Sequence, residues 1–151
     1  MNIVPLTFEN PLWNTVADYA ERCPWRAGKE LANRMRSGAF NGWERVFVAI
    51  SKEQIAGFCA FVEWDCIPDV SYTPYISYVF VDKDFRGHRL SESMIRQAGN
   101  YAHALGFQRL YLVSDHVNLY EKYGFIKIDA KPAPWNAEVL ESIFSLTLPS
   151  H

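Results

Sequence analysis

The residues best suited to do chemistry lie in one short basic segment, residues 86–91, which reads RGHRLS. An unbroken apolar run, Tyr78–Val81, precedes this segment and is typical of a buried strand. A helical pattern begins directly after it, so the segment is predicted to join a strand to a helix. The first amides of a helix lack carbonyl partners, and the helix dipole adds partial positive charge there. Together with the basic side chains, these amides predict an anion site that suits phosphate.

The basic segment matches neither of the two common nucleotide-binding patterns. It contains no GxGxxG and no GK[ST], so neither a dinucleotide fingerprint nor a P-loop is present. From the local pattern alone, an ordinary strand-to-helix turn with a solvated basic face is as good an interpretation as an anion site.

A second segment, Leu119–Phe125, reads LYEKYGF and places a tyrosine at the start of a short helix. A phenol is protonated at neutral pH, so Tyr120 could serve as a proton donor. The alternative interpretation is that Tyr120 is simply a packed aromatic residue. His116 follows the strand predicted over 109–113, and the ordinary pKa of histidine suits proton transfer near neutral pH. His116 is therefore a candidate general base. Glu63 and Asp65 are further candidates for this role, and a base that acts through a water molecule also stays open.

The two segments together resemble the acyl-CoA-binding core of the GNAT superfamily of N-acetyltransferases. In that family a strand ends in a turn of pattern [QR]-x-x-G-x-[GA], and a helix follows. Arg86 matches the first position, Arg89 stands where the family usually has its first glycine, and Ser91 stands in place of Gly or Ala. The segment LYEKYGF is similar to the family's "lYeklGF". The resemblance extends from about Tyr78 to Phe125.

The resemblance implies an acyltransferase that moves an acetyl group from acetyl-CoA, its cosubstrate, to a primary amine on a small molecule or peptide. The turn amides would hold the coenzyme pyrophosphate, Tyr120 would be the general acid, and the pantetheine arm would run between residues 78–81 and 109–113. Neither motif contains a cysteine, so direct attack by the amine is expected in place of a covalent acyl-enzyme. The coenzyme-binding residues so implied are Val79, Phe80, Val81, Arg86, Gly87, His88, Arg89, Leu90 and Ser91.

Two functions outside enzymology stay open at this stage. The same fold could hold acyl-CoA as a sensor without turnover, or it could be an interaction domain whose basic turn binds nothing specific. Coenzyme binding separates the interaction domain from the other two, and thioester turnover separates the enzyme from the sensor.

Length and composition exclude several classes of protein. A chain of 151 residues with 49% hydrophobic and 21% charged residues predicts one globular domain over 1–151. The net charge of −2 argues against a nucleic-acid partner. No apolar run approaches the ~20 residues that span a bilayer, and the first residues lack the pattern of a signal peptide. We therefore expect no membrane partner, and a homodimer stays open.

The cysteines and histidines indicate neither a disulfide framework nor a metal site. The three cysteines form no CxxC, and the four histidines show no ligand spacing. Reduced thiols in the cytoplasm are the simplest interpretation.

The periodicity predicts an α/β (α+β) domain with a mixed, mostly antiparallel sheet of six or seven strands and helices on both faces. Strands are expected over 3–8, 44–51, 54–65, 75–81, 109–113, 125–128 and 139–148. Helices are expected from Pro11 to Pro24 and over 25–36, 91–105 and 119–123, with Ser91 as an N-cap of the third. Loops are expected over 63–69 and 131–135.

Overall fold

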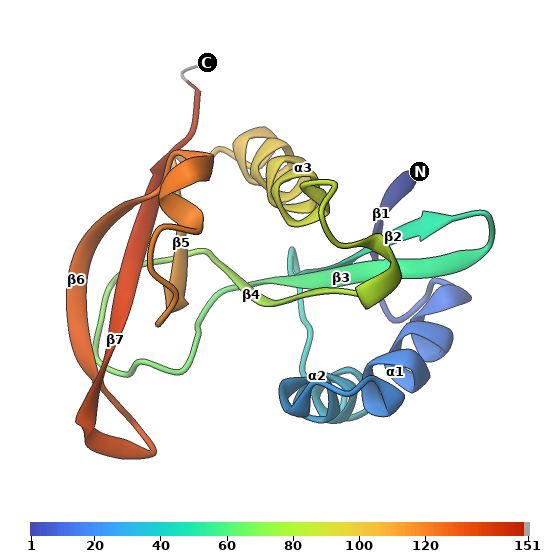
Figure 1. The fold of residues 1–151 in the computed structure, drawn as a ribbon, viewed down its shortest axis with the longest axis horizontal. Coiled ribbons are helices and arrows are strands. Elements are labelled where there is room, and N and C mark those ends of the chain that lie inside the picture. The colour runs from blue at the N-terminus through green and yellow to red at the C-terminus, as the bar shows by residue number, and fades with distance from the viewer. Residues whose placement is uncertain (150–151) are drawn as a thin grey trace. The chain divides into compact units, whose positions relative to one another are not determined.

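The computed structural model describes residues 1–149, and these form two compact units (Figure 1). Unit 1 consists of Met1–Phe61 and Tyr78–Gln97, and unit 2 consists of Val62–Ser77 and the chain from Ala98 onward. Strand β4 (Tyr75–Val81) and helix α3 (Leu90–Ala104) each contribute their first and last residues to different units.

The strands of unit 1 form an antiparallel array. Strand β1 (Asn2–Leu6) pairs with β2 (Arg45–Ser51), and β2 pairs with β3 (Gln54–Val62) through a hairpin. The two turn residues of that hairpin, Lys52 and Glu53, both have positive φ, as a type I′ turn requires. The end of β4 lies beside β3, where the Asp82 amide donates to the Ala56 carbonyl at 2.8 Å.

Helices cover both faces of these strands, as predicted. Helices α1 (Leu12–Arg22) and α2 (Arg26–Arg36) bury apolar residues at helical spacing. Tyr19 and Trp25 contact the ring of Phe58, whereas the neighbouring residue Gly57 faces Met94 near the start of α3. Adjacent strand residues point to opposite faces, so α1 and α2 lie on one side of β3 and the first turns of α3 on the other (Figure 1).

Gly57 also lets β3 and β4 approach closely. A Cβ atom at this position would lie 2.6 Å from the Phe80 carbonyl oxygen and 3.3 Å from Val81 Cα. Because both atoms belong to backbone, no side chain could be added here without moving a strand.

Unit 2 is built on the first residues of β4, on β5 (Arg109–Ser114) and on the hairpin of β6 (Ile126–Ala133) and β7 (Asn136–Thr147). Strand β4 runs parallel to β5, with Tyr75 opposite Tyr111. Strand β5 is antiparallel to β7, which in turn pairs with β6. The apolar residues buried in this unit include Leu110, Leu112, Phe125, Ile143 and Phe144.

Read strand by strand, the order is β1-β2-β3-β4-β5-β7-β6, with one parallel pair, β4 and β5. The predicted fold class, a mixed and mostly antiparallel sheet of six or seven strands, is therefore confirmed. The predicted loop over 131–135 is wrong, because β6 continues to Ala133 and only Pro134 and Trp135 form the hairpin turn. Pro132 is tolerated because β6 is an edge strand, where a missing amide donor breaks no interior ladder.

The predicted N-cap of the third helix is also wrong. Helix α3 already begins at Leu90, so Ser91 lies in its first turn and does not cap it. The short 3₁₀ helix η2 (Tyr120–Tyr123) is preceded by Leu119, and Asn118 before it has a left-handed backbone. Within residues 1–149, no helix combines the length and apolar character needed to cross a bilayer.

Candidate active site

The turn that follows β4 in unit 1 is organised by one carboxylate. Asp82 precedes a short 3₁₀ helix, η1 (Lys83–Phe85), and its Oδ1 accepts a hydrogen bond from the Asp84 amide at 3.0 Å. Its Oδ2 accepts a second bond from the Tyr19 hydroxyl at 2.6 Å. These two donors, the hydroxyl first, hold the pKa of Asp82 below its ordinary value, so the side chain is ionised at neutral pH.

Arg86 ties the turn back to the strand. Its Nε donates to the Val81 carbonyl oxygen at 3.1 Å, and its guanidinium carbon lies 6.0 Å from the centroid of the Phe80 ring. The guanidinium is thereby held at the end of β4, where it adds positive charge to the turn.

Two residues of the basic segment have a left-handed backbone. Gly87 has φ of +88°, and Arg89, directly before α3, has φ of +56°. Arg89 occupies the position at which the family motif has glycine, the residue that adopts such a φ without strain. Its side chain is 65% exposed and forms an ion pair with Glu92, with Nη2 2.9 Å from Oε2.

The other residues expected to bind the coenzyme divide into buried anchors and exposed positions. Leu90 is buried and fixes the start of α3, whereas His88 is exposed and Ser91 is half-buried. Phe80 is buried between Phe58 and Trp25, at centroid distances of 5.3 and 5.7 Å. The half-buried residues Val79 and Val81 flank Phe80 on the strand.

Strand β4 is irregular immediately before these residues. Tyr78 has φ of +53°, which is unusual for a bulky residue and interrupts the regular strand backbone. Its hydroxyl donates to Glu30 Oε1 on α2 at 2.8 Å, and the guanidinium carbon of Arg34 lies 5.6 Å from its ring centroid. These contacts with α2 hold the side chain of the irregular residue in place.

The two predicted catalytic residues meet in unit 2. Tyr120 is buried, and its ring centroid lies 6.2 Å from that of His116 in an edge-to-face arrangement. Phe125 and Phe144 pack around the same ring at 6.2 and 6.3 Å. His116 is exposed, and its amide donates to Ser114 Oγ at 3.0 Å. Tyr120 is therefore both a packed aromatic and a neighbour of His116.

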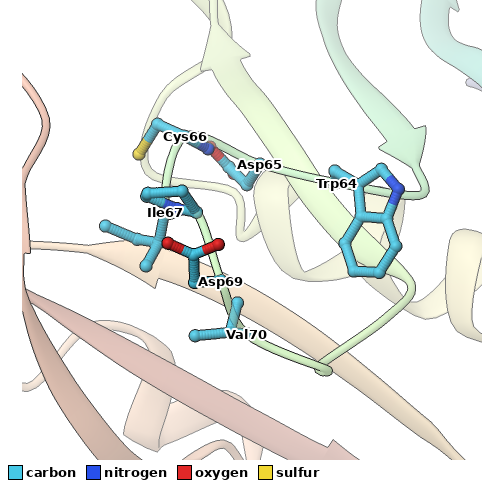
Figure 2. A pocket seen from close by; sticks show the side chains of 7 residues that line it. Trp64, Asp65, Cys66, Ile67, Asp69 and Val70 are labelled. Carbon is cyan, nitrogen blue, oxygen red and sulfur yellow. The ribbon is translucent and has the colours of Figure 1, made fainter.

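Unit 2 also contains a pocket and a buried carboxylate that the sequence did not reveal. The loop Trp64–Val70 lines a pocket of about 310 Å³, in which Asp69 points toward the middle of the loop (Figure 2). Glu141 on β7 is only 7% exposed. It lies two residues before buried Ile143, so strand alternation places it on the same face and could have identified it.

Among the residues that the structure describes, no group of His, Cys, Asp or Glu is arranged to hold a metal ion. The three cysteines, Cys23, Cys59 and Cys66, are all free.

A family model described as an acetyltransferase (GNAT) domain matches residues 42–127, which is more than half of the 151-residue chain and includes both motifs. The chain belongs to the GNAT acetyltransferase family. The resemblance stated from the sequence is thus confirmed, and the chain is an acyltransferase of this family. A comparison with curated proteins gives no match.

Solved structures of this GNAT acetyltransferase's relatives share the fold over nearly the whole chain. The aminoglycoside 6'-N-acetyltransferase from Enterococcus faecium has a TM-score of 0.74 at 16% identity, covering 100% of this chain and 99% of its own. An aminoglycoside 6'-N-acetyltransferase complexed with coenzyme A has a TM-score of 0.72 at 15% identity, with 100% and 99% covered. A GNAT family acetyltransferase from Elizabethkingia anophelis with acetyl-CoA bound gives 0.67 at 16%, with 97% of each chain covered. At these identities the likeness establishes the fold.

Proposed function

We propose that this GNAT-family protein transfers an acetyl group from acetyl-CoA to a primary amine by direct attack of the amine on the thioester. The observation that carries the proposal is the left-handed backbone of Gly87 and Arg89 at the basic start of α3. Such a backbone turns successive amides toward one point, as anion-binding loops do. Coenzyme A and acetyl-CoA are bound in two of the structurally similar acetyltransferases, which supports the choice of ligand.

In this proposal the coenzyme is held mainly by backbone. The amides of residues 87–91 bind the pyrophosphate, with the charge of Arg86 beside them. The pantetheine arm bonds to the backbone of Val79–Val81 in the manner of an added strand. The irregular backbone at Tyr78 supports this role, because a strand that departs from regular pairing leaves amides and carbonyls for a ligand.

The reaction needs a neutral amine, a stabilised oxyanion and a protonated leaving group. The amine nitrogen forms the new C–N bond, the C–S bond breaks, and the coenzyme leaves as a thiolate. Tyr120 donates its phenolic proton to that thiolate, and a backbone amide near Phe80 stabilises the oxyanion. His116 accepts the proton that the amine loses, and its contact with the Tyr120 ring supports this pairing.

The two units act as a single N-acetyltransferase domain over 1–151, and the acceptor is a small-molecule or peptide amine. A cytoplasmic location is supported by the three free cysteines, since thiols remain reduced there. A homodimer stays a prediction.

Two measurements on the purified protein test the proposal. Coenzyme A at about 100-fold above its Kd should stabilise the fold by roughly 2.7 kcal/mol, which appears as a higher melting temperature. Thiol release from acetyl-CoA should be stimulated by at least one acceptor in a screen of monoamines, polyamines, amino acids, aminoglycosides and N-terminal peptides. Coenzyme binding without turnover would favour the acyl-CoA sensor, and no binding at millimolar coenzyme would refute both.

A further inference from the structure

Glu141 is a buried carboxylate without a counter-ion. It is 7% exposed, and within residues 1–149 no hydrogen bond or ion pair joins its side chain to another residue. Burying a charged group without a partner is costly, so folded proteins rarely retain one unless the site has a use. The remaining exposure leaves the carboxylate open to a ligand from solvent.

The charged groups around Glu141 are negative, so a cation bound beside it would be stabilised by more than one carboxylate. Asp115 follows β5, and Asp65 lies in the loop after β3. Burial first, then the negative charges of Asp115 and Asp65, hold the pKa of Glu141 above its ordinary value of 4.5. Burial first, then the charge of Asp65, raises the pKa of Cys66 to about 12, and the charge of Glu141 makes a smaller contribution. The cysteine therefore stays a neutral thiol and supplies no additional charge.

The lysine that lies opposite Glu141 in the pairing of β6 with β7 is close to a different carboxylate. Lys131 on β6 is opposite Glu141 in the register of β7, but its Nζ lies 3.9 Å from Asp129 Oδ2. Asp129 also accepts a hydrogen bond from the Tyr72 hydroxyl at 3.0 Å. The lysine opposite Glu141 is thus close to another carboxylate, Asp129.

The pocket in the loop Trp64–Val70 is lined by Asp65 together with a second carboxylate, Asp69. Figure 2 shows the Trp64 ring across the loop from Ile67 and Val70, with the Asp69 carboxylate on the same side as Ile67 and Val70. An aromatic face with carboxylates beside it suits an alkylammonium group, which gains both cation–π and ionic attraction.

A second buried polar group lies in the same region. The Tyr75 side chain is 1% exposed, and its hydroxyl has no hydrogen-bond partner within the described chain. Desolvation, followed by the charge of Asp65, raises the pKa of Tyr75, so the hydroxyl stays protonated beside that carboxylate. A buried hydroxyl without a partner next to an acidic group is a further sign of a site that lacks its ligand.

We propose that Glu141, Asp65 and Asp115 bind a cationic group of the acceptor, so that the natural acceptor is an amine with at least two positive charges. The inference rests on the proposed function and specifies its substrate class. The attacking amine must lose its proton before it reacts, so the cation held at Glu141 is a second, non-reacting ammonium. A diamine or polyamine meets both requirements, and a simple monoamine meets only one.

Kinetics with matched acceptors test this assignment. The probes are α,ω-diaminoalkanes of three to eight carbons, the monoamines of equal length, and spermidine. At least one di- or triamine should have kcat/KM about tenfold or more above its matched monoamine, the scale of a desolvated charge pair. Equal kcat/KM values for diamines and monoamines would overturn the assignment.

The variant Glu141→Gln keeps the size of the side chain and removes its charge. It should abolish most of the preference for diamines through a higher KM for the diamines. The matched control is Glu138→Gln, an exposed glutamate on the same strand, which should behave as wild type. A preference for diamines that survives Glu141→Gln would assign the recognition to other residues and refute the role of Glu141.

Calorimetry separates this inference from the proposed function. Diamine is titrated into protein saturated with coenzyme A, so no turnover is needed. Binding that is lost in Glu141→Gln and retained in Glu138→Gln would support the cation site even if no amine released thiol. No binding of any diamine to the wild type, together with active turnover of monoamines, would refute the site and leave the transferase function intact.

Discussion

The Tyr19 hydroxyl lies 2.6 Å from Asp82 Oδ2 and connects α1 to the turn between β4 and α3. The two residues are 63 positions apart in the sequence. Since the other Asp82 oxygen accepts the Asp84 amide, one carboxylate fixes both the turn and its distance from α1. The basic turn proposed to hold the coenzyme is therefore supported from outside its own segment.

Replacing Tyr19 by Phe should loosen this turn while keeping the ring that packs on Phe58 and Phe80. We expect a loss of about 1 kcal/mol in unfolding free energy, the scale of one hydrogen bond, together with weaker coenzyme A binding. The pKa of Asp82 is lowered in the folded state, so the stability that it contributes is present above its ordinary value of 3.8 and is lost as pH falls through the lowered pKa. The difference between wild type and Tyr19→Phe should shrink below pH 3.8, as denaturant titrations at several pH values can measure. An equal difference at all pH values would show that the Tyr19–Asp82 bond is not its cause.

Two variants of Arg89 distinguish the effect of its backbone conformation on stability from the effect of its side chain. Its left-handed φ costs a non-glycine residue of order 1 kcal/mol, whereas its exposed ion pair with Glu92 returns less than about 0.5 kcal/mol. We therefore expect Arg89→Gly to melt at the same temperature as wild type or higher, and Arg89→Ala to melt lower than Arg89→Gly.

Coenzyme titration of the same two variants identifies the phosphate ligand. If amides hold the pyrophosphate, Arg89→Gly should bind coenzyme A within a few-fold of wild type. If the guanidinium holds it, both variants should bind more weakly, and the loss should be larger at low salt. That second result would transfer the anchoring role from the backbone to the side chain.

The sequence predicted the elements that depend on residues close together in the chain. It did not reveal hydrogen bonds between residues that are far apart in the chain. The strand that includes Tyr78–Val81 and the helix that follows the basic segment were predicted because an apolar run and a helical pattern each leave a signal within a few residues. The bond between Tyr19 and Asp82 left none, since neither residue forms part of a motif. Glu141, by contrast, left a local signal, because it alternates with the buried residue Ile143 along β7.

The pH dependence of stability tests whether Glu141 is buried as a charge. Its pKa is raised above the ordinary value of 4.5, so the folded protein is favoured while the carboxyl is protonated and loses stability as pH rises through the raised pKa. Glu141→Gln, which stays neutral, should therefore match wild type near pH 4 and be more stable than wild type at pH 8. Denaturant titrations at both pH values check this, with Glu138→Gln as the control. A Gln variant less stable than wild type at pH 8 would mean that Glu141 has a favourable partner.

Tyr120→Phe tests the proposed general acid most directly. The change removes one hydroxyl and keeps the ring that packs against Phe125 and Phe144, so the fold should survive with less than about 1.5 kcal/mol lost. Coenzyme A binding should change little, because backbone of unit 1 is proposed to supply it. The chemical step should slow by at least about tenfold, a cautious limit for a positioned acid that contributes about 10²–10⁴-fold. The matched control is Tyr123→Phe in the same turn of 3₁₀ helix, which should retain full activity.

The rate to measure for Tyr120→Phe is the single-turnover rate with saturating acetyl-CoA and amine, because slow product release can conceal a change in chemistry in steady-state kcat. A slower single turnover with an unchanged KM for acetyl-CoA fits an interaction made only in the transition state. Loss of folding would assign Tyr120 to the core as a structural hydroxyl. A single-turnover rate equal to that of Tyr123→Phe and wild type would show that the thiolate leaves without a proton from Tyr120, and His116 would then have to be tested as the donor.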